Sequence, residues 1–182
     1  MKKIMFNDKF LLTQAVLNGT KTRRLLKEGT PLGNWEETAK CLPYKVGDIV
    51  AIAQPYKDII ECMAEYSDII INVDGSINRE YKAGWTNKMF VKANLMPHHI
   101  KITDVRIERL QDITEEDCLK EGVWQFYDDK NLFYVSKNIG YAPDVAFLSA
   151  REAFWYLIDS ISGKGTLERN PWVGVYTFER VD

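Results

Sequence analysis

The feature that most constrains the fold is a long strand-like stretch in mid-chain whose alternation changes phase. Ile100 and Ile102 share one phase of a two-residue repeat, whereas Val105 and Ile107 share the opposite one. A strand keeps both pairs on one face only if an extra residue interrupts it, so we expect a bulge at residues 103–104. Bulges suit tightly curved sheets, and this stretch therefore favours a small barrel over a flat sheet.

Helix and strand signals on either side of this stretch predict an α+β chain. Helix N-caps are read at Asn7, Thr114 and Ser149, and each of these helices ends at a glycine; the first and the third carry apolar residues at helical spacing. A buried strand is expected at 49–53, and a last strand with alternating residues at 172–178. The remaining stretches are read as a loop at 27–43, a helix at 56–65, strands at 69–73 and 89–93, and a turn at Asp74–Gly75.

Length and composition indicate one ordinary globular domain over residues 1–182, with 56–88 as an insertion on its surface. The chain is 46% hydrophobic and 27% charged, and its formal charge of −2 makes duplex DNA an unlikely partner. No apolar run approaches the roughly 20 residues that span a bilayer, and no signal peptide is seen, so we expect a cytoplasmic chain with no membrane association. Three scattered cysteines beside only His98 and His99 predict no metal site.

A short cationic segment is the first candidate for function. Gly19 and Thr20 are followed by Lys21, Thr22, Arg23 and Arg24. Cations at a helix C-terminus interact favourably with its dipole, so capping and solubility are one interpretation. The alternative is a corner that binds an anion or a carbonyl, where neighbouring guanidinium groups lower the proton affinity of Lys21 and allow it to act as a base.

Glu121 and several tryptophans are further candidates. A glutamate before a glycine at a helix end is usually solvated, but the helix dipole disfavours a negative charge there, and a cationic partner such as Lys21 would explain it. Trp85, Trp124 and Trp172 are candidate stacking platforms, although most tryptophans are core or rim residues. The chain has no dinucleotide, Walker, zincin or nucleophile-elbow motif, so no cofactor is expected.

Five segments follow one another along the chain: Gly19–Arg24, Tyr44–Asp48, Val105–Gly122, Ser149–Phe154 and Asn170–Trp172 with the strand that follows. This ordered set resembles the ASCH family of the PUA-like superfamily, in a larger branch common in phage and prophage genomes. The resemblance covers most of the chain except residues 56–88 and 125–145. It implies a small curved PUA-like β-barrel flanked by helices, with a cleft where the Lys21 segment faces the barrel.

The resemblance also implies a function and site residues. ASCH proteins are proposed to bind RNA or modified nucleosides, and a small branch is similar to an amidohydrolase that deacetylates acetylated cytidine with a lysine, a threonine and a glutamate. By position the lysine is Lys21 and the glutamate is Glu121. The family's second threonine is met by Arg24, and Thr22 is the hydroxyl that remains nearby.

Three hypotheses follow from these residues. The first is a domain that binds single-stranded RNA or a modified nucleoside through Lys21, Arg23, Arg24 and Glu121, with Trp85 as a stacking residue. The second is an amidohydrolase on an acylated base, or a weak ribonuclease, in which Lys21, Thr22 and Glu121 are catalytic. The third is a non-enzymatic phage accessory module that binds a protein partner.

Overall fold

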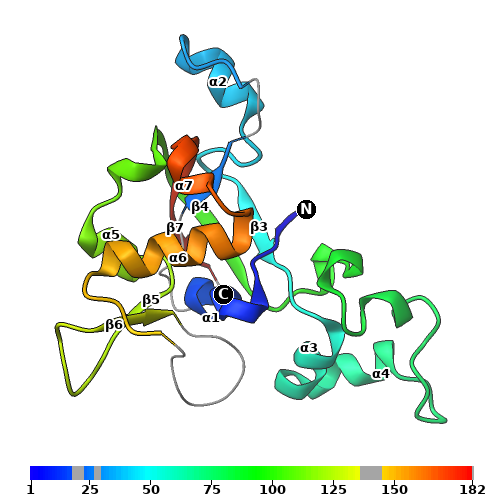
Figure 1. The fold of residues 1–182 in the computed structure, drawn as a ribbon. Coiled ribbons are helices and arrows are strands. Elements are labelled where there is room, and N and C mark those ends of the chain that lie inside the picture. The colour runs from blue at the N-terminus through cyan, green and yellow to red at the C-terminus, as the bar shows by residue number, and fades with distance from the viewer. Residues whose placement is uncertain (18–22, 27–29, 136–144, 182) are drawn as a thin grey trace. The chain divides into compact units, whose positions relative to one another are not determined.

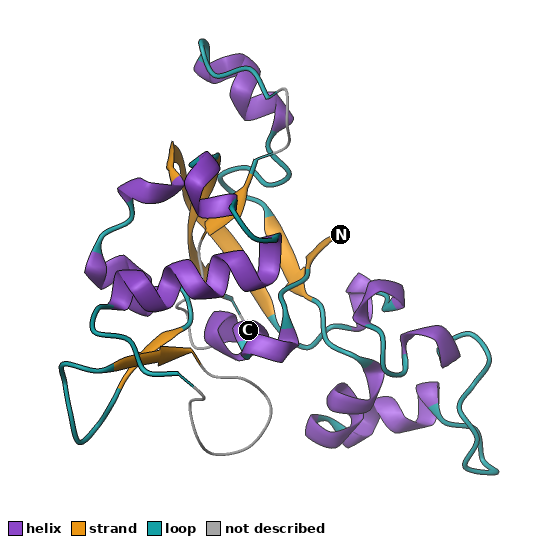
Figure 2. Cartoon of the chain, viewed as in Figure 1, coloured by secondary structure: helices purple, strands orange, loops and turns teal. Residues whose placement is uncertain are grey.

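The computed structural model describes residues 1–182 except 18–22, 27–29, 136–144 and 182 (Figure 1). Helices and strands are both present, and most of the strand pairs are antiparallel, so the mixed architecture is compatible with the expected α+β class (Figure 2). The chain divides into two compact units, and the expectation of a single domain remains a prediction. Unit 1 comprises Met1–Phe6, Ile49–Lys101 and Arg180–Asp182, and unit 2 comprises Asn7–Asp48 and Ile102–Glu179. In the described part of the chain, no helix is long and apolar enough to cross a membrane.

Unit 1 is built on three strand segments and several short helices. Strand β1 (Lys2–Ile4) runs parallel to β3 (Ile49–Ile52), and β3 pairs antiparallel with the first residues of β4 (His99–Arg109). The helical elements are α3 (Tyr56–Cys62), η2 (Ala64–Tyr66), α4 (Ser67–Ile70), η3 (Lys82–Gly84), η4 (Lys88–Phe90) and η5 (Ala93–Leu95). Their apolar side chains surround Tyr56 and Ile59, which are fully buried. Residues 56–88, expected to be an insertion, therefore belong to a unit with its own apolar core.

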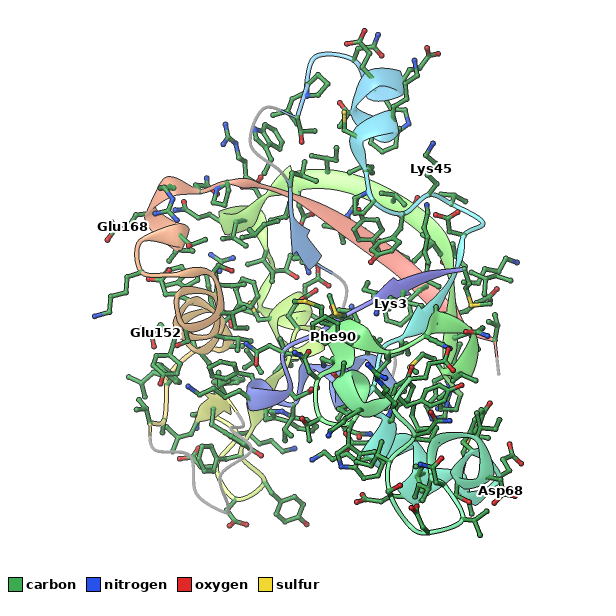
Figure 3. The ribbon with its side chains drawn as sticks, turned by 90° about the vertical axis from the view of Figure 1, so that its right-hand side faces the viewer. Lys3, Lys45, Asp68, Phe90, Glu152 and Glu168 are labelled. Atoms are coloured by element: carbon green, nitrogen blue, oxygen red, sulfur yellow. The ribbon has the colours of Figure 1, made fainter. Side chains whose placement is uncertain are left out.

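Two predictions in unit 1 are wrong in their secondary structure. The strand expected at 69–73 is replaced by α4, and only Ile71 forms a single bridge, to Ile77. The strand expected at 89–93 is replaced by 3₁₀ turns. A lysine explains this second difference, because the ammonium of Lys3 donates to the carbonyl oxygens of Met89 at 2.6 Å and Val91 at 2.7 Å, which a strand would commit to a neighbour (Figure 3).

Unit 2 contains the rest of β4 together with β7 (Trp172–Arg180), β2 (Arg23–Leu25) and the hairpin of β5 (Val123–Gln125) and β6 (Phe133–Val135). Its helices are η1 (Asp8–Phe10), α1 (Leu12–Leu17), α2 (Trp35–Cys41), η6 (Leu110–Asp112), α5 (Glu115–Lys120), α6 (Ala150–Ser162) and α7 (Thr166–Arg169). The long helix α6 packs against α5 and against both strands of the hairpin (Figure 1). The strand order β4-β7-β2 ends at β2, and neither described sheet closes on itself. The barrel implied by the resemblance is therefore not shown.

Local signals predicted most of unit 2 correctly. The side chains of Thr114 and Ser149 each accept a hydrogen bond from a backbone N–H of the helix that they begin. Asn7 accepts from the Lys9 N–H but caps only the 3₁₀ turn η1, and the helix expected there begins anew at Leu12, because Leu11 has φ +52°. The phase change in β4 is also present, since residues 103 and 104 are both exposed. The loop expected at 27–43 is wrong at Trp35–Cys41, which form α2 with Asn34 as N-cap. Pro31 and Gly33 precede this helix and Pro43 follows it, so none of them interrupts it.

Candidate functional site

The structure describes only part of the predicted site. Lys21 and Thr22 lie outside the described residues. Arg24 belongs to β2, where it pairs with Gly174 of β7. Trp85 lies in unit 1, where it packs against the apolar core. Arg23 and Glu121 lie in unit 2 and are in direct contact, so the cationic segment and the predicted glutamate do meet, through Arg23.

The backbone of Arg23 is bound by the carboxylate of Glu121. The N–H of Leu26 donates to the carbonyl of Trp172. Backbone N–H groups alternate in direction along a strand, so those of Arg24 and Leu26 point towards β7 and that of Arg23 points away from it. On that outer side, the Arg23 N–H donates to Glu121 Oε1 at 2.8 Å, a contact between residues 98 positions apart. Because β2 ends the strand order, Glu121 provides the acceptor that a further strand would otherwise supply.

The Arg23 guanidinium is buried among carboxylates. Its side chain is 3% exposed, and Nη2 lies 2.7 Å from Glu108 Oε1 and 2.8 Å from Asp117 Oδ2. Its Nε also donates to Glu108 Oε1 at 2.8 Å, and Nη1 lies 3.4 Å from Glu121 Oε1. One arginine thus links β4, α5 and the end of α5 to the edge strand β2.

Glu121 is fully buried because of the way α5 ends. It is the C-cap of that helix, where its N–H donates to the carbonyl of Cys118 at 3.0 Å. The next residue, Gly122, has φ +96°, and a Cβ there would lie 2.6 Å from a methyl carbon of Leu12. The chain therefore turns in the left-handed region against α1, and only glycine fits both the backbone angle and the space.

Two exposed cations, Arg106 and Lys120, contact the outer carboxylates of the cluster. Arg106 lies 3.4 Å from Glu108 Oε2 and 3.8 Å from Asp117 Oδ2. Lys120 bridges Glu116 at 3.1 Å and Asp117 at 3.2 Å along α5. Glu108 and Asp117 are thus shared between the buried Arg23 and cations that face solvent.

Opposing effects set the pKa values in the cluster. Burial alone would lower the pKa of Arg23, but its hydrogen bond to Asp117 and the charges of Glu121 and Glu108 raise it above the ordinary value. Burial alone would raise the pKa of Asp117, but hydrogen bonds from Arg23 and Lys120 lower it. Both groups are therefore charged at neutral pH.

Arg23 and Glu121 are engaged with groups of the cluster itself. Glu121 Oε1 accepts from the Arg23 N–H at 2.8 Å and from its guanidinium at 3.4 Å, so this carboxylate holds the start of β2. Arg23, expected to contact a ligand, has its guanidinium engaged by three carboxylates. No group of metal-ligating side chains is found among the described residues.

Sequence reasoning missed Glu108 and Asp117. Glu108 lies two residues after Arg106 on β4, on the same side of the strand, and Asp117 occupies the third position of α5, where a helix N-terminus favours an acid. Each has an ordinary local explanation, so neither signals a buried arginine 85 or 94 residues away. The candidate platform Trp124 is 40% exposed on β5, and Trp172 is partly buried on β7.

No family model, no curated protein and no solved structure matches this chain. The resemblance to the ASCH family therefore remains a prediction, and function is argued below from the residues alone.

Proposed function

We propose that unit 2 binds single-stranded RNA or a modified nucleoside at the cationic segment before β2, beside Glu121. The curved PUA-like barrel expected from the sequence is part of the same proposal. Lys21 and Thr22 enter it through their place in the sequence, directly before Arg23.

One observation carries this proposal: the buried Glu121 carboxylate is bound to the first residue of β2. This contact joins two segments that the resemblance nominated independently for one site. The contact fixes the backbone of Arg23, the residue that follows Lys21 and Thr22 in the sequence. Glu121 is then a positioning residue, and Lys21 is the group offered to the ligand.

The overall charge supports a small or single-stranded ligand. A formal charge of −2 gives no broad cationic surface for a duplex. The cations of the cluster are also largely balanced, since Arg23, Arg106 and Lys120 all pair with carboxylates. Recognition would depend on a few local contacts.

The test is an NMR titration of ¹⁵N-labelled protein with cytidine, N4-acetylated cytidine and a single-stranded RNA hexamer. The expected result is a set of amide shifts that includes Arg23 and Glu121. The same tubes are followed for released acetate or shortened RNA, which would support the hydrolase or ribonuclease hypothesis instead.

Matched variants make the titration specific. Lys21→Ala should abolish the shifts, whereas Lys164→Ala, an exposed lysine of unit 2, should retain them. Glu121→Gln should weaken binding more than Glu168→Gln, which changes an exposed carboxylate. If none of the three ligands shifts any resonance of the wild-type protein, the proposal is wrong and a protein partner becomes the better hypothesis.

A further inference from the structure

Among the described residues, Arg109 at the end of β4 is held in place by an aromatic ring and a backbone carbonyl, without a carboxylate. Its guanidinium carbon lies 4.3 Å from the centre of the Trp172 ring, and its Nη1 donates to the carbonyl oxygen of Asn170 at 2.9 Å. Both side chains are partly exposed. The stack fixes the plane of the guanidinium, and the hydrogen bond fixes its rotation within that plane.

Asn170 is itself fixed. It has φ +43°, a left-handed conformation that asparagine tolerates better than most residues. Its Oδ1 accepts from the Gln111 N–H at 2.9 Å, and its own N–H donates to the Leu167 carbonyl at 2.9 Å. The carbonyl that holds Arg109 is therefore part of a hydrogen-bonded turn that connects α7, β7 and the end of β4.

The contrast with Arg23 defines what Arg109 can do. Three carboxylates engage the buried Arg23. In the described part of the chain, Arg109 donates to one neutral carbonyl and stacks on one ring, and it pairs with no acid. Its remaining N–H donors point in a fixed plane, which is the geometry that binds two oxygens of a phosphate.

We propose that Arg109, stacked on Trp172, binds a backbone phosphate of single-stranded RNA. The inference rests on the proposed function and extends it with a phosphate contact at the end of β4. Trp172 and Asn170 orient the guanidinium, so little rotamer entropy is lost when the phosphate binds.

The experiment measures affinity for the RNA hexamer as a function of salt in wild-type protein and in Arg109→Gln. Loss of one phosphate contact on a single strand should lower the slope of log K against log salt by about 0.7, which is about fivefold in affinity between 1 M and 0.1 M salt. Affinity for free cytidine, which has no phosphate, should not change. Arg109→Lys keeps the charge but loses the planar fork, so its affinity for the RNA hexamer should lie between those of the wild-type protein and Arg109→Gln. Arg79→Gln removes an exposed arginine of unit 1 as the matched control and should behave as wild type.

Each outcome separates this inference from the proposed function. If wild-type protein binds RNA and Arg109→Gln has the slope of Arg79→Gln, the phosphate contact is wrong and the proposed function stands. If Arg109→Gln and Arg109→Lys lower cytidine and RNA affinity equally, the stack is a structural feature only, which also overturns the inference. If Arg23 and Glu121 show no shifts but cytidine monophosphate shifts the Arg109 Nε–H and the Trp172 indole, the proposed site is wrong and the phosphate contact stands. If the hexamer and the monophosphate shift neither pair, both proposals are wrong.

Discussion

Replacing Arg23 with methionine should strongly destabilise unit 2. Methionine reaches about as far as the Nε of arginine, so the change keeps the packing of the aliphatic part of the side chain and removes the guanidinium with its charge. The Arg23 backbone N–H remains, and its hydrogen bond to Glu121 Oε1 can persist. What the variant loses is the positive charge beside a carboxylate that has no exposed surface.

The magnitude follows from the burial of the partners. Breaking a buried ion pair by removing one member costs about 3–5 kcal/mol, because the other charge is left without compensation. Glu108 and Asp117 should add little, since their side chains are 19% and 21% exposed and both also contact Arg106. For a chain of this length, the expected cost corresponds to a fall in Tm of about 6–20 °C.

The assay is urea unfolding, followed by circular dichroism and by hydrogen exchange of the α5 amides, which report on unit 2. Arg23→Met combined with Glu121→Gln should recover about 2 kcal/mol of the loss, because the amide accepts the Arg23 N–H without a buried charge. Arg79→Met, at an exposed position of unit 1, should stay within about 0.5 kcal/mol of wild type. A cost below about 1 kcal/mol for Arg23→Met would refute the reasoning, because it would mean that Glu121 needs no cation.

Three further predictions concern neighbouring features. Gly122→Ala should cost about 2–4 kcal/mol, from the left-handed backbone and the close contact with α1, whereas Gly33→Ala, with open space around it, should be near neutral in the same urea assay. Burial raises the pKa of the Cys118 thiol to about 12, so in a Cys62→Ala variant Ellman's reagent should modify exposed Cys41 at once and Cys118 only on unfolding, and adding Cys118→Ser should remove that slow phase. The pKa of Asp117 is lower in the folded state than in the unfolded chain. Its contribution to stability is therefore present above about pH 4 and is lost as pH falls through the pKa of the folded state. Asp117→Asn should flatten this acid limb of the stability–pH curve.

Short-range signals account for the elements that sequence analysis predicted correctly. A capping side chain acts within three residues of itself, so the caps of η1, α5 and α6 could be recognised without knowledge of the fold. The phase change at residues 103–104 is equally local. The strand predicted at 89–93 failed because its carbonyls bind the ammonium of Lys3, more than 80 residues earlier. Periodicity within a window has no access to such a partner.

The site shows the same division between local and distant causes. From sequence, a glutamate before a glycine at a helix end is most often solvated, and its burial here depends on two facts outside that helix. Leu12 of α1 packs where a Cβ on Gly122 would lie, which keeps the turn tight. Arg23 then supplies both an outward N–H from an edge strand and a guanidinium, so the buried charge is satisfied. Because the helix dipole opposes a carboxylate at this end, such a partner is required for Glu121 to be buried while charged. The unfavourable local position of a charge was therefore the one signal in the sequence that pointed to a distant contact.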